Sequence, residues 1–130
     1  MAHPNEVLAR EAAAAFQHGD LDALRDNYLA ADTRWHVAGR NPVAGDYEGV
    51  DQVLGLFVKI FELTEGTYRI EVHDVVANDE HVVSLLTARA ERAGRQLTAN
   101  QTLVSHFADG KFSEVWVQQV DPYAVDEFFS

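Results

Sequence analysis

The segment QLTANQTLVSHFADGKFSEVWVQQV, residues 96–120, contains the clearest structural signal in the chain. Its centre, Asp109-Gly110, favours the two-residue turn of a β-hairpin, because Asp and Gly both tolerate the positive φ angles that such a turn requires. Apolar and polar side chains alternate on both sides of the turn. We therefore expect two antiparallel strands, Gln96–Phe107 and Phe112–Val120, joined tightly.

The same alternation continues toward the N-terminus. Residues Tyr68–Val76 and His81–Arg92 show the period of two that is typical of half-buried strands. Polar and glycine-containing turns at residues 78–80 and 93–95 separate these strands from each other and from the hairpin. The second half of the chain therefore predicts four consecutive antiparallel strands.

The first half shows helical periodicity instead. One helix is expected up to Gly19, a shorter one begins after Asp20, and a third follows Val50. A strand over residues 32–38 separates the second and third helices, and Asp121-Pro122 predicts a short terminal helix. This order favours one α+β domain over residues 1–130, with helices packed on one face of a curved sheet. The space between the two layers predicts a small-molecule pocket.

Composition and charge restrict the classes of function. With 10 Lys and Arg against 21 Asp and Glu, the net charge is −11, which argues against nucleic-acid and membrane-surface partners. The chain has no cysteine, and its six histidines lack the spacing of metal ligands, so we expect neither a metal nor another cofactor. No apolar run has the length of a membrane span and no signal segment is evident, so we expect a cytoplasmic protein.

Three motifs resemble the SnoaL-like and ketosteroid-isomerase-like proteins of the nuclear-transport-factor-two-like superfamily. They are His18–Leu24, the stretch from Trp35 through Asp51, and the stretch from Phe107 through Trp116. The resemblance implies a cystatin-like, cone-shaped α+β fold, in which a curved antiparallel sheet holds helices on its concave face. It also implies a homodimer formed through the outer face of the sheet.

The resemblance implies a set of pocket residues as well. Counting from Gly19-Asp20, the general base of the ketosteroid isomerases corresponds to His36, which is therefore the candidate catalytic residue. Alanine and leucine stand where those isomerases have their oxyanion donors, Ala12 and Leu103, so ketosteroid isomerase activity itself is not expected. The candidate pocket-lining residues are Phe16, Arg34, Phe57, Gln101, Leu103 and Gln119.

Two functions remain open from the sequence. The first is an enzyme of isomerase, cyclase, hydratase or hydrolase type, which uses His36 for acid–base chemistry on an apolar, oxygen-bearing molecule. The second is a protein of the same fold that binds such a molecule, or a partner, without turnover. A pocket-facing His36 with a carboxylate or tyrosine beside it favours the enzyme.

Overall fold

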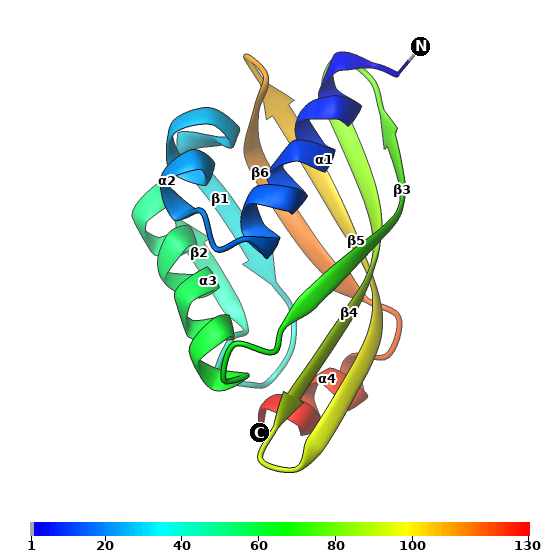
Figure 1. Ribbon diagram of the computed structural model, residues 1–130. Helices are drawn as coiled ribbons and strands as arrows, with labels where there is room; N and C mark the ends of the chain where they lie inside the picture. The colour runs from blue at the N-terminus through cyan, green and yellow to red at the C-terminus, as the bar shows by residue number, and fades with distance from the viewer. Residues whose placement is uncertain (1) are drawn as a thin grey trace.

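The computed structural model describes residues 2–130, in which six strands form a single curved sheet in the order β2-β1-β6-β5-β4-β3 (Figure 1). The strands are β1 (Leu29–Val37), β2 (Gly45–Glu48), β3 (Arg69–Ala77), β4 (His81–Arg92), β5 (Arg95–Ala108) and β6 (Lys111–Gln119). The helices are α1 (Pro4–Gln17), α2 (Leu21–Ala23), α3 (Val50–Leu63) and α4 (Pro122–Phe129). A π-helical turn, Leu24–Tyr28, connects α2 to β1.

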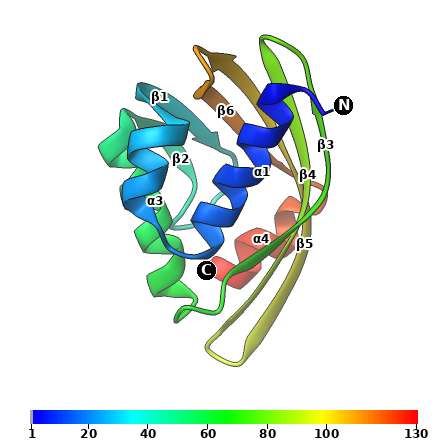
Figure 2. The ribbon, with the colours of Figure 1, turned by 45° about the horizontal axis from the view of Figure 1, so that its top comes forward.

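The helices α1 and α3 lie on the concave side of the sheet (Figure 2). Helix α1 contacts β3, and α3 contacts β1, so each covers a different half of the curved sheet. Helix α4 lies at one end of the molecule, near the far end of the β4–β5 hairpin (Figures 1 and 2). The predicted α+β class, with helices on the concave face, is therefore confirmed.

The predicted turns and caps form as their side chains dictate. Asp109 and Gly110 have φ angles of 53° and 75°, so both adopt the left-handed conformation expected of this hairpin turn. The Asp20 carboxylate accepts a hydrogen bond from the Ala23 amide at the start of α2. Asp121 does the same for Ala124 at the start of α4. These caps satisfy backbone donors that a helix leaves unpaired at its N-terminus.

The sheet differs from the prediction in two respects. Strand β2 lies within the glycine-rich stretch 39–49, which we expected to be irregular; it is only four residues long and mostly exposed, so no alternation marks it. Strand β1 pairs antiparallel with β2 but parallel with β6, although an antiparallel sheet was expected. Its partner β6 is more than seventy residues away, and such long-range pairing leaves no local pattern.

Helix α4 is held in place by the burial of its apolar face and by hydrogen bonds at its C-terminal end. Val125, Phe128 and Phe129 are buried against the rest of the chain, as their apolar spacing predicts. At the C-terminal end, the guanidinium groups of Arg92 and Arg95 donate hydrogen bonds to carbonyl oxygens of residues 127, 128 and 130. Cations at this position complement the unpaired carbonyls and the helix dipole.

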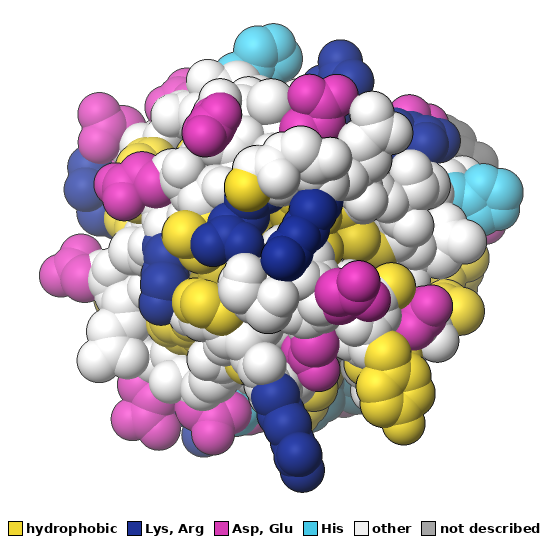
Figure 3. Space-filling view, turned by 90° about the horizontal axis from the view of Figure 1, so that it is seen from below, with side chains coloured by type: hydrophobic (Ala, Val, Ile, Leu, Met, Phe, Trp, Pro, Cys, Tyr) yellow, Lys and Arg dark blue, Asp and Glu magenta, His cyan; other side chains and the backbone are white. Residues whose placement is uncertain are grey.

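Several Lys and Arg side chains gather on the end of the molecule seen in Figure 3, despite the negative net charge.

Candidate functional site

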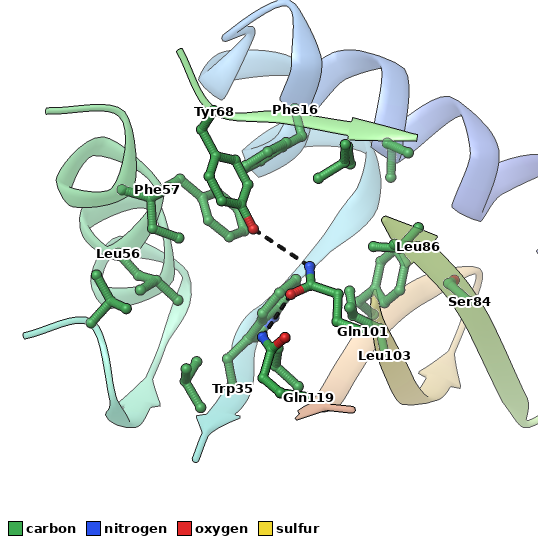
Figure 4. A pocket seen from close by; sticks show the side chains of 18 of the residues that line it. Phe16, Trp35, Leu56, Phe57, Tyr68, Ser84, Leu86, Gln101, Leu103 and Gln119 are labelled. Atoms are coloured by element: carbon green, nitrogen blue, oxygen red, sulfur yellow. Dashed lines mark hydrogen bonds between the residues drawn. The ribbon is translucent and has the colours of Figure 1, made fainter. Parts of the chain in front are cut away.

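A cavity of about 120 Å³ lies between the concave face of the sheet and the helices. Its wall combines residues of α1, α3 and α4 with the inward positions of β1, β3, β4, β5 and β6 (Figure 4). The wall is predominantly apolar, and its aromatic members are Phe16, Trp35, Phe57, Tyr68, Phe112 and Phe129. Such a concave apolar wall with few polar groups is typical of small-molecule sites.

Three polar side chains form a chain of hydrogen bonds within this wall. The Gln119 amide donates from Nε2 to Oε1 of Gln101, at 2.7 Å. The Gln101 amide in turn donates from Nε2 to the hydroxyl oxygen of Tyr68, at a longer 3.5 Å (Figure 4). The chain therefore joins β6, β5 and the residue just before β3 across the cavity.

Two buried polar atoms of cavity-lining residues have no hydrogen-bond partner within residues 2–130. They are the indole Nε1 of Trp35, which is a donor, and the Oε1 of Gln119, which is an acceptor. Buried polar groups in proteins are nearly always paired, with protein or with a bound molecule. The unpaired donor and acceptor thus indicate where a polar group of a ligand could bind.

Tyr68 is the only ionisable residue among the described residues that line the cavity. Its side chain is buried, and burial raises the pKa of the phenol above its ordinary value. Tyr68 is therefore protonated near neutral pH. It can donate a hydrogen bond or a proton to a ligand, but it cannot serve as a general base there.

The structure places five of the expected pocket residues on the cavity wall. Phe16 and Phe57 meet edge to face, with ring centroids 5.1 Å apart, at the contact between α1 and α3. Gln101, Leu103 and Gln119 point inward from β5 and β6. Tyr68 and Trp35 were not singled out from the sequence; the alternation of β3 placed Tyr68 on the apolar face, but no local pattern marks its hydroxyl as a partner of Gln101.

His36 and Arg34 require a correction, since neither lies on the cavity wall. The β1 residues that line the cavity are Leu29, Trp35 and Val37, and side chains alternate between the two faces of a strand. His36 and Arg34 therefore project from the outer, convex face of the sheet. The expectation that they face the pocket is wrong by one residue of strand register.

On the outer face, His36 lies between two carboxylates. Its Nδ1 is 2.7 Å from Oδ1 of Asp46 on β2, and its Nε2 is 2.7 Å from Oε2 of Glu114 on β6. Arg34 pairs with the other oxygen of Glu114 at 3.1 Å, and the His36 ring stacks on Trp116. Only a protonated imidazole can donate from both nitrogens, so the hydrogen bonds to Asp46 and Glu114 raise the pKa of His36.

This arrangement predicts a pH dependence of stability. Because the pKa of His36 is higher in the folded than in the unfolded chain, its stabilisation is complete below about pH 6.5 and is lost as the pH rises through the raised pKa. Between about pH 6 and pH 9, wild type should lose up to about 1 kcal/mol more than His36→Gln, since solvent screens a partly exposed pair. Urea unfolding across this range measures the difference. If the free energy of unfolding changes equally with pH in the two proteins, the contacts of His36 with Asp46 and Glu114 contribute nothing to stability.

Within residues 2–130, no group of three or more His, Asp or Glu side chains is arranged to hold a metal ion. In the same range, no helix is both long and apolar enough to span a membrane.

Comparison with known proteins identifies the family. A model of the SnoaL-like domain matches residues 9–115. The uncharacterized protein Rv0034 of Mycobacterium tuberculosis is 31% identical over 124 residues, which cover 95% of this chain and 94% of the relative. The solved structure of Bal32a, from a soil-derived mobile gene cassette, superposes with a TM-score of 0.94 at 29% identity, covering 98% of this chain and 97% of Bal32a.

A second solved structure, a protein of unknown function with a cystatin-like fold from Xanthomonas campestris, superposes with a TM-score of 0.89 at 25% identity. It covers 97% of this chain, and the match covers 98% of that protein. The family model matches most of the chain, and the relative and both structures cover at least 95% of it. The chain belongs to the SnoaL-like family.

Proposed function

We propose that the protein binds an apolar small molecule in the inner cavity and that binding, rather than acid–base turnover at His36, is its function. The observation that carries the proposal is a mostly apolar cavity whose wall holds one buried donor and one buried acceptor that have no partner among residues 2–130. Apolar surface supplies the driving force for binding, and the few polar atoms orient the ligand.

The arrangement of ionisable groups favours binding over the catalytic alternative. The candidate base, His36, lies on the opposite face of the sheet and is engaged by Asp46 and Glu114. Among the described residues that line the cavity, Tyr68 is the only ionisable proton donor, and none carries a carboxylate or imidazole that could remove a proton. Turnover that needs a strong base is therefore not part of the proposal.

Calorimetric titration with acetophenone tests this function. Acetophenone has one ring and one carbonyl, which suits a cavity of about 120 Å³. We expect saturable binding of one molecule per chain. If neither acetophenone nor its hydrocarbon counterpart ethylbenzene binds, the proposal is wrong.

We further propose that a second copy of the chain covers the outer face of the sheet. A row of rings crosses this face, His36, Trp116, His106 and His81, with successive centroids 5.4, 5.1 and 4.9 Å apart. Aromatic side chains are enriched in protein interfaces, and a twofold contact brings the same patch of each copy together. The pairing of Arg34 and His36 with Glu114 and Asp46 balances charge on this face, which removes a barrier to self-association.

Light scattering at micromolar concentration tests the dimer. The expected particle has twice the chain mass of 14.5 kDa. Trp116→Lys should give the monomer, because it places a charge in the centre of the proposed contact. Tyr123→Lys, at a position that is 83% exposed on α4, should remain dimeric. A wild-type particle of 14.5 kDa would exclude the dimer.

A further inference from the structure

We infer that the inner cavity selects an uncharged ligand that carries both a carbonyl and a hydroxyl group. Tyr68, at one end of the Tyr68–Gln101–Gln119 hydrogen-bond chain, donates to the carbonyl, and Gln119, at the other end, accepts from the hydroxyl. The inference rests on the proposed function, because it names the class of molecule that the cavity holds. Three features of the wall support it, namely the direction of the hydrogen-bond chain, the position of the unpaired atoms, and the charge of the surroundings.

The hydrogen-bond chain has a direction. Gln101 uses its Oε1 to accept from Gln119, so its Nε2 donates toward the oxygen of Tyr68. Because the Tyr68 oxygen already accepts, its own O–H proton is available to another acceptor. At the opposite end, Gln119 uses its Nε2 as donor, and its Oε1 has no partner within residues 2–130. The chain thus offers a donor at one end and an acceptor at the other.

Trp35 adds a second donor to the same wall. Its residue is 8% exposed, it lines the cavity, and its indole N–H has no partner in the described part of the chain. A ligand carbonyl oxygen has two lone pairs and can accept from Tyr68, from Trp35 or from both. A ligand hydroxyl can donate to Gln119. A molecule with both groups would satisfy atoms that the described residues leave unpaired.

The cavity offers no counter-charge to an ionic ligand. None of its described lining residues is Lys, Arg, His, Asp or Glu. Moving a carboxylate or ammonium group from water into such a wall costs several kcal/mol unless a partner of opposite charge is present. Burial raises the pKa of the Tyr68 phenol because it disfavours the phenolate anion. The same burial disfavours a ligand that carries a negative charge. Neutral molecules are therefore selected over ions of the same shape.

A matched set of single-ring compounds tests the inference by calorimetry at about pH 6. Ethylbenzene has no polar group, acetophenone adds an acceptor, and meta- and para-hydroxyacetophenone add a donor to that acceptor. Benzoate is an anion of similar shape. One net hydrogen bond corresponds to roughly 3- to 10-fold in affinity. We expect acetophenone to bind 3- to 10-fold more tightly than ethylbenzene, one hydroxy isomer to gain a similar factor, and benzoate to bind at least about 100-fold more weakly than acetophenone.

Two variants test which residue of the hydrogen-bond chain is responsible for each gain in affinity. Gln119→Leu should abolish the gain from the hydroxyl and leave the gain of acetophenone over ethylbenzene. Tyr68→Phe should reduce the gain from the carbonyl. The matched control is Gln118→Leu, because Gln118 is exposed on the same strand and does not line the cavity. The control should reproduce all wild-type affinity ratios.

The outcomes separate this inference from the proposed function. If all compounds bind with equal affinity, if benzoate binds best, or if the hydroxyl gain survives in Gln119→Leu, the inference is wrong while ligand binding by the cavity stands. If no compound binds, the proposed function and the inference both fail. Both are supported if the affinities are graded in wild type and in Gln118→Leu, if Gln119→Leu loses only the gain from the hydroxyl, and if Tyr68→Phe shows a smaller gain from the carbonyl.

Discussion

Ser84→Phe is expected to weaken the binding of acetophenone by more than about 100-fold and to leave the protein folded. Ser84 lies on β4, is 6% exposed, and lines the cavity opposite Leu103 of β5. A phenyl ring at this position occupies the space that the ligand needs, and removing the apolar contacts of a small ligand eliminates most of its binding energy. The new ring fills an existing cavity, so the melting temperature should change by only a few degrees.

Thr87→Phe is the matched control for this variant. Thr87 lies on the same strand, but it does not line the cavity, and its hydroxyl donates to Asn100 on the neighbouring strand. This variant adds a similar ring on the outer face and should bind acetophenone as wild type does. Undiminished binding by Ser84→Phe, with a folded protein, would show that the ligand site lies elsewhere.

Phe128→Ala is expected to lower the melting temperature by about 10–20 °C. Phe128 is 3% exposed and meets Phe129 edge to face, with ring centroids 4.9 Å apart. Truncating a buried phenylalanine to alanine costs about 3–5 kcal/mol, through lost apolar burial and the cavity that remains. For a chain of this size, each kcal/mol corresponds to about 3–5 °C.

Tyr123→Ala provides the comparison for Phe128→Ala on the same helix. Tyr123 is 83% exposed, so its truncation should change the free energy of unfolding by about 0.5 kcal/mol or less. Calorimetric melting of the two variants beside wild type measures both effects. Similar melting temperatures for all three proteins would mean that α4 is not part of the cooperative fold.

The strands with regular alternation could be assigned to their faces from the sequence. In β5 the alternation puts Gln101 and Leu103 on one face, the family resemblance implied that Leu103 and Gln119 face the pocket, and all three lie on the cavity side of the sheet. In the segment around His36, Asp32, Arg34 and His36 share one parity and Trp35 and Val37 share the other, so the alternation itself indicates that His36 lies on the polar face of the strand. The expected orientation of the His36 side chain depended instead on counting from Gly19, and an error of one residue moves a strand side chain to the other face of the sheet.

Other features leave no signal that single-sequence reasoning can use. The parallel pairing of β1 with β6 joins segments far apart in the chain. The hydrogen-bond chain likewise joins Tyr68, Gln101 and Gln119 from three separate elements. The sequence shows that two amides share a sheet face, but their donor and acceptor roles depend on neighbours that only the folded arrangement supplies.

The two tryptophans of the chain lie on opposite faces of the sheet and report separately on the two surfaces. Trp35 lines the cavity with an indole N–H that has no partner in the described part of the chain, whereas Trp116 stacks on His36 on the outer face. A nitrogen–proton correlation spectrum resolves the two indole N–H signals, and Trp116→Phe assigns them.

Titration of the labelled protein with acetophenone tests ligand binding by the cavity most directly. We predict that the Trp35 indole signal moves downfield and saturates, because the ligand carbonyl supplies its missing acceptor, while the Trp116 signal stays in place. Saturable movement of Trp116 with a stationary Trp35 would place the ligand on the outer face and contradict the proposal.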